Sequence, residues 1–96
     1  MYIKIHKVPT GEVVAVCDEA ILGKTLEDKK YTVKVSEHFY KGERKDVRSI
    51  TPMLKAATYI NIIGEEAVAL GLKLKIITQE NIILIAGVPH AQIYTQ

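Results

Sequence analysis

The chain has 96 residues and a mass of 10.7 kDa, which suffices for one small domain, over 1–96, with a single hydrophobic core. Hydrophobic residues make up 48% and charged residues 25%, a balance that excludes an intrinsically disordered chain. The single cysteine excludes a disulfide framework and a zinc site built on several cysteines. Because no apolar stretch is long enough to cross a membrane and the N-terminus is unlike a signal peptide, we expect a cytoplasmic protein without a membrane partner.

The net charge of +2 is unevenly distributed along the chain. Residues 24–55 carry nine basic and five acidic side chains, whereas 1–23 and 56–96 each have a net charge of −1. Such asymmetry favours a surface that faces a polyanion. The alternative is an ordinary solvated face, because the isoelectric point of 8.7 is below that typical of nucleic-acid-binding domains.

A β-hairpin is the first predicted element. Residues 2–8 alternate between apolar and polar side chains, and the valine-rich stretch 12–17 returns as the second strand. A three-residue loop closed by Gly11 in a left-handed conformation places Val8 opposite Glu12.

The segment after the hairpin is less regular. Residues 18–30 predict a short helical turn that Asp18 caps and Gly23 ends. Alternation over 30–36 predicts a third strand, and 38–48 is polar and charged.

A long helix is predicted next. Thr51 is placed to cap it and Pro52 to occupy its first position, and apolar residues at helical spacing extend it from 52 to about 74. A break is expected near Gly64. Alternation over 72–76 leaves a strand there as the alternative.

The last predicted strand is the apolar run 82–86, which reads as a buried central strand. Residues 87–89 end it, and an extended tail follows to Gln96. These elements predict an α+β fold. Its small mixed or antiparallel sheet contains the hairpin, the third strand and the central C-terminal strand, and a long or broken helix covers one face.

Catalytic and metal-binding motifs are weak. The tripeptide 23–25 is similar to the end of a phosphate-binding P-loop, but Asp18 stands where that motif needs a glycine, which favours a simple loop. The predicted hairpin register puts His6 and Cys17 on opposite faces, where they cannot share an ion. No serine or cysteine has an identifiable partner base, so the sequence favours a non-catalytic protein with no metal or cofactor.

Two segments could contact a ligand. Phe39 and Tyr40 stand at the start of the basic stretch. Because successive side chains of a strand point to opposite faces, one of the two rings should be exposed. We assign Phe39 to the core and Tyr40 to stacking on unpaired bases. In the small-residue segment 86–92, His90 and Gln92 could read a ligand by hydrogen bonds. The alternative there is a chain reversal with a satisfied histidine.

These motifs together resemble an archaeal family of single-domain proteins known as a domain of unknown function, number four-two-four. The resemblance is carried by 6–8, 11–13, 22–25 with Asp18, 39–42, 64–68 and, most specifically, 85–92. It implies an RNA-binding or translation-linked role, with no established reaction, cofactor or catalytic residue. The sequence departs from the family pattern at Gly71 and Lys75, and its thirteen isoleucines would suit a heat-adapted source.

The leading hypothesis is therefore a non-catalytic RNA-binding or ribosome-associated module that uses a central basic face. Its expected nucleic-acid contacts are Lys24, Lys29, Lys30, Lys34, Tyr40, Lys41, Arg44, Lys45, Arg48, His90 and Gln92. One alternative is a small ligand-binding protein or enzyme that uses Asp18, Lys24 and His90 in one pocket. The other is a homo-oligomeric interaction domain, such as a homodimer closed through a bare apolar sheet edge.

Overall fold

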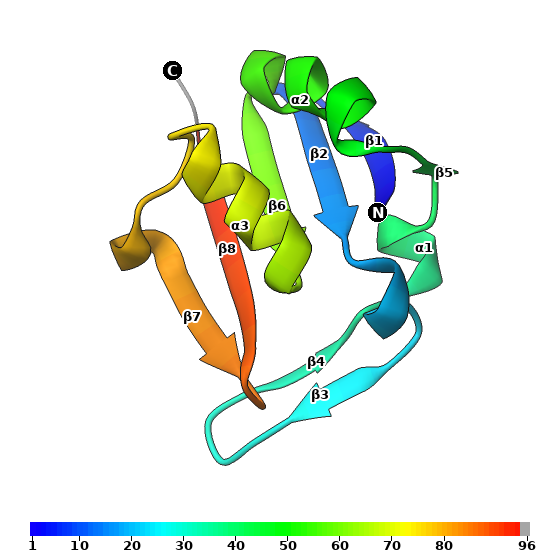
Figure 1. Cartoon of the computed structure of the whole chain (residues 1–96). Helices are drawn as coiled ribbons and strands as arrows, with labels where there is room; N and C mark the ends of the chain where they lie inside the picture. Colours follow the sequence, from blue (N-terminus) through cyan, green and yellow to red (C-terminus); the bar gives the residue numbers. More distant parts are fainter. Residues whose placement is uncertain (95–96) are drawn as a thin grey trace.

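A computed structural model describes residues 1–94, which form eight strands and three helices (Figure 1). The strands are β1 (Tyr2–Val8), β2 (Gly11–Cys17), β3 (Thr25–Glu27), β4 (Thr32–Lys34), β5 (Glu43–Arg44), β6 (Tyr59–Ile63), β7 (Ile82–Ile85) and β8 (Val88–Tyr94). The helices are α1 (Glu37–Tyr40), α2 (Val47–Ala56) and α3 (Glu65–Lys73). Short 3₁₀ turns are η1 (Glu19–Ile21) and η2 (Gln79–Asn81).

Six of the strands form one sheet in the order β5-β1-β2-β6-β8-β7, and β3 and β4 pair separately. The pairs of the large sheet are antiparallel except β2 with β6, which are parallel. In Figure 1, α2 and α3 lie across one face of the sheet. The predicted α+β fold with a mixed sheet is confirmed.

The two faces of the sheet are covered unequally. On one face, Ile50 and Leu54 of α2 and Val68 of α3 pack in a core with Val16 and Ile62 of the central strands. On the other face a second cluster, which includes Cys17, Ile63 and Ile85, is covered by residues of α1, β3 and the segment after β4. This second cover protects only one end of the sheet, so part of the face stays open.

The predicted hairpin is confirmed, but its register was wrong by one residue. Val8 pairs with Gly11 across a two-residue turn, not with Glu12 across three. Gly11 does have a positive φ of 146°, and a Cβ there would lie 3.1 Å from the Thr58 hydroxyl oxygen. This one-residue shift moves each side chain of the second strand to the face opposite the predicted one. His6 and Cys17 therefore lie on the same face of the sheet.

The single helix over 52–74 was wrong, because a strand divides it. Asp46 caps α2 by accepting a hydrogen bond from the Ser49 amide at 2.9 Å, so the helix begins before Thr51 and Pro52 lies inside it. The chain then extends as β6, whose run of isoleucines favours a strand. The expected break at Gly64 is real, and α3 begins there.

The two C-terminal strands lie in other positions than we predicted. The run 82–86 was expected to be central, but β7 is an edge strand and Leu84 is 61% exposed. A turn at Ala86 and Gly87, with φ of 49° and 82°, reverses the chain, and the expected tail becomes the interior strand β8. The last two residues of the tail, 95 and 96, lie outside the described residues.

The strand expected over 30–36 forms only as β4, and it lies in the small sheet with β3. The strand alternative over 72–76 does not form, because α3 continues to Lys73 and ends in a turn at Lys75, where φ is 59°.

Candidate functional site

The basic residues assigned to nucleic-acid contacts form two groups. One lies on and beside the β3–β4 hairpin, and the other lies between α1 and the first turn of α2; Figure 1 shows the hairpin tip and β5 well apart. The first group is Lys24, Lys29, Lys30 and Lys34, and the second is Lys41, Arg44, Lys45 and Arg48. In the second group, Arg44 pairs with Glu19 at 2.8 Å and Lys45 with Glu43 at 3.3 Å.

Tyr40 is buried, contrary to its prediction, whereas Phe39 packs against the second core cluster as predicted. Tyr40 is only 4% exposed, and its ring meets that of Phe39 edge-on at 4.8 Å, so it has no free face for a base. Phe39 is half-buried and stacks on His6 at 4.6 Å. Alternation misassigned Tyr40 because Ser36 caps a helical turn here, α1, rather than ending a strand.

A buried polar network holds Tyr40 in place. Its hydroxyl donates to Asn61 Oδ1 at 2.5 Å, and His90 Nε2 donates to the same oxygen at 3.1 Å. Since His90 is buried and already bonded, it is a satisfied structural histidine in this fold rather than an exposed reader of a ligand. Asn61 was missed in the sequence, although it is the one polar residue within the strand β6 between isoleucines.

Burial lowers the pKa of His90 below its ordinary 6.5, because the imidazolium would lose its hydration. The unfolded chain therefore gains this proton at a higher pH than the folded protein does. We expect the free energy of unfolding to fall as the pH drops from about 6.5 towards 5. His90→Gln keeps an N–H donor for Asn61 but cannot be protonated, so it should lack this part of the fall.

Urea denaturation across this pH range measures the effect. Asp28 and Asp46 do not interfere, because backbone hydrogen bonds lower their pKa from 3.8 and their contribution is lost only at more acidic pH. A His90→Gln profile parallel to that of the wild type would show that His90 is not the titrating group.

The residues of the enzyme hypothesis are engaged separately. Asp18 accepts hydrogen bonds from the amides of Glu66 at 2.9 Å and Ala67 at 2.8 Å, so its carboxylate caps the N-terminus of α3. Lys24 is exposed on the β3 side, and His90 bonds to Asn61. The structure therefore gives each of the three residues different surroundings.

The next groups to consider are the thiol and the side chains that could bind a metal. Burial raises the pKa of the Cys17 thiol to about 11, and the Asp18 carboxylate adds to the shift, so the thiol stays protonated at neutral pH. Within residues 1–94, no three His, Cys, Asp or Glu side chains gather as a metal site. No helix in the same range is long and apolar enough to cross a membrane.

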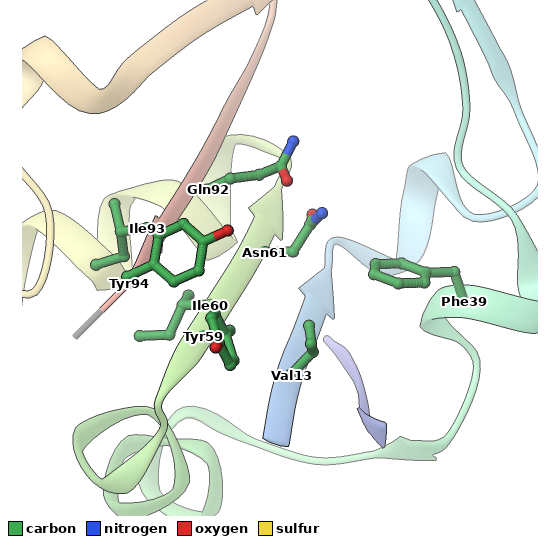
Figure 2. Close-up of a pocket in the computed structure, with 8 residues that line it drawn as sticks. All are labelled: Val13, Phe39, Tyr59, Ile60, Asn61, Gln92, Ile93 and Tyr94. Atoms are coloured by element: carbon green, nitrogen blue, oxygen red, sulfur yellow. The ribbon is translucent and has the colours of Figure 1, made fainter. Parts of the chain in front are cut away.

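A hollow of about 220 Å³ lies on the open part of the second sheet face (Figure 2). Strands β2, β6 and β8 form its floor, and Figure 2 shows Phe39 of α1 across it from Gln92 and Tyr94. Its lining residues are Val13, Phe39, Tyr59, Ile60, Asn61, Gln92, Ile93 and Tyr94. None of them is charged, so the hollow suits a flat neutral group better than an ion.

Aromatic rings and amides stand side by side in this hollow. Tyr59 and Tyr94 are paired across β6 and β8, and their rings meet edge-on at 4.6 Å and 77°. Two residues along the strands, on the same face, Asn61 lies opposite Gln92. Tyr94 is 77% exposed, and Thr10 and Tyr59 share a hydroxyl hydrogen bond of 2.7 Å. A planar ring could stack on Tyr94 while its edge meets an amide.

Of this hollow, the sequence identified only Gln92 and Phe39, and it assigned Phe39 to the core. Tyr59 and Tyr94 were missed because β6 was assigned to a helix and β8 to a tail. The pattern that could have revealed them is the polar alternation of Tyr59 with Asn61 and of Gln92 with Tyr94, which places all four on one face.

A crystal structure of an uncharacterized conserved protein from Methanopyrus kandleri has a similar fold. The TM-score is 0.82 at 30% sequence identity, and the match covers 97% of this chain and 89% of the other. None of the curated proteins compared with the chain matches it. Residues 6–95 match a family described as "Protein of unknown function (DUF424)". The chain therefore belongs to the DUF424 family.

Proposed function

We propose that this protein is a non-catalytic module that binds single-stranded RNA, with a base held in the hollow against Tyr94. The observation that carries the proposal is the exposed Tyr94 ring, set edge-on to Tyr59 and close to the amide of Gln92 on an open sheet face. Unpaired bases stack on such rings, and amide groups can hydrogen-bond their edges. A translation-associated role would be one use of such a module.

In this proposal a base is recognised at Tyr94 rather than at Tyr40, and the basic groups still contact the phosphates. Phe39 lies at the wall of the hollow, and the exposed Lys41 is two residues further along the chain. In the described part of the chain, no ion pair engages Lys41 or Arg48, whereas Arg44 and Lys45 are paired with glutamates. Lys41 and Arg48 are therefore the cations of this group best able to meet phosphates.

The test is a salt titration of binding to a short single-stranded RNA, followed by fluorescence anisotropy. Tyr94→Ala should weaken binding by about 1–3 kcal/mol and leave the salt dependence unchanged, because stacking releases no counterions. Replacing Lys41 and Arg48 by Ala should make the log–log salt slope shallower by about 1.4, at about 0.7 for each phosphate contact.

The matched control is Tyr31→Ala, which removes another exposed tyrosine, 38% accessible, from the β3–β4 connection. It should bind RNA as the wild type does. The proposal fails if the wild type binds RNA no better than an unrelated protein of equal isoelectric point, or if Tyr31→Ala loses as much affinity as Tyr94→Ala.

A further inference from the structure

Strand β7 is a bare and apolar edge of the large sheet. It pairs with β8 on one side only and ends the strand order, as Figure 1 shows. All its residues are aliphatic; Ile83 is 40% and Leu84 is 61% exposed. It has none of the lysine, proline or bulge devices by which sheet edges usually avoid pairing with another strand.

The ladder geometry shows which backbone groups of β7 are free. Ile85 and Val88 flank the two-residue turn, so they form a hydrogen-bonded pair, and the alternation of an antiparallel ladder gives the next such pair to Ile83 and His90. Leu84 therefore directs its N–H and C=O away from β8, towards the open edge. The following outward amide, that of Ala86, is already bonded to Asp28 Oδ2 at 2.8 Å.

We propose that β7 pairs antiparallel with β7 of a second copy of this chain, through the N–H and C=O of Leu84. A strand that offers one donor and one acceptor on the same edge is its own complement under a two-fold axis. The exposed side chains of Ile83 and Leu84 would then pack beside the aliphatic side chains of the second β7.

Charge at the two ends of the edge fits this antiparallel arrangement. Glu80 lies exposed just before β7, and the exposed Lys29 and Lys30 lie beside Asp28, which is tied to the other end of β7. Antiparallel pairing brings Glu80 of each copy towards Lys29 and Lys30 of the other. The Asp28 carboxylate already accepts three backbone hydrogen bonds. Lys29 and Lys30 therefore make this turn the positively charged partner of Glu80.

A four-residue edge is small, so the dimer should be weak. Stable interfaces bury about 1,200–2,000 Å², which is more than one short strand pair provides, and we expect a dissociation constant on the order of 100 µM. Sedimentation equilibrium of the full chain from about 10 to 500 µM should show the mass rising from one chain towards two.

Three variants and a matched control locate the contact. Leu84→Lys should remain monomeric over the whole range, because a lysine on the edge opposes pairing. Glu80→Lys should weaken the dimer about 3–10-fold, and adding Lys29→Glu and Lys30→Glu to it should restore the loss. Val8→Lys places the same change on the opposite side of the sheet, in the part of β1 that extends beyond its pairing with β5. Val8 is 36% exposed there, and this variant should dimerise like the wild type.

Circular dichroism of each variant confirms that it is folded before its mass is interpreted. A wild-type protein that stays monomeric at the highest concentration overturns the proposal. So does a Leu84→Lys protein that still dimerises, or a Val8→Lys protein that does not, since either result puts the contact elsewhere. None of these readouts depends on RNA binding.

Discussion

Gly64→Ala is expected to lower the free energy of unfolding by about 4 kcal/mol, which is exceptional for a single methyl group. Gly64 has a φ of 111°, a region that residues with a Cβ rarely adopt. A Cβ built there lies 2.3 Å from Cγ of Asp18, the carboxyl group that caps α3. The substitution therefore adds backbone strain and displaces a buried carboxylate from two amide donors.

Gly23→Ala is the matched control for this prediction. Gly23 also has a positive φ, of 85°, but nothing lies within 4 Å of the position that its Cβ would take. Backbone strain alone should cost about 1 kcal/mol there. Urea denaturation of both variants measures the difference, and equal losses would mean that contact with Asp18 is not the cause of the Gly64 effect.

The sequence predicted local elements well where one periodic pattern was present. Alternation over 2–8 identified β1, and the break expected near Gly64 coincides with the start of α3. It failed at β6, because Ile60 and Gly64 happened to continue the helical spacing of α2. Strand order also escaped it, since the places of β7 and β8 depend on long-range pairing that no local pattern records.

The candidate site was less predictable than the fold for a related reason. The basic residues could be identified by type alone, and they are exposed or half-buried as expected. The hollow, however, arises where α1 and β3 leave part of the sheet uncovered, and its residues come from three strands and a helix. Tyr40 and Tyr94 differ in their tertiary surroundings, which a single sequence does not specify.

Asn61→Ala is expected to lower the free energy of unfolding by about 3 kcal/mol. The Asn61 carbonyl oxygen accepts hydrogen bonds from Tyr40 and His90, and those two side chains are only 4% and 6% exposed. Alanine removes the acceptor and leaves both buried donors without a partner in the protein. Each unsatisfied buried donor costs about 1–3 kcal/mol, because it keeps its desolvation penalty and loses its bond.

The residue opposite Asn61 on β8 supplies the control, and a double mutant tests the cause. Gln92 is exposed, so Gln92→Ala should change stability by less than about 0.5 kcal/mol. Tyr40→Phe removes one of the two donors, so adding Asn61→Ala to it should cost about 1–2 kcal/mol less than Asn61→Ala costs in the wild type. Equilibrium denaturation of the four proteins in this cycle gives the coupling. Strictly additive losses would show that the Tyr40 hydroxyl does not depend on Asn61, and that the cost of Asn61→Ala comes from lost packing instead.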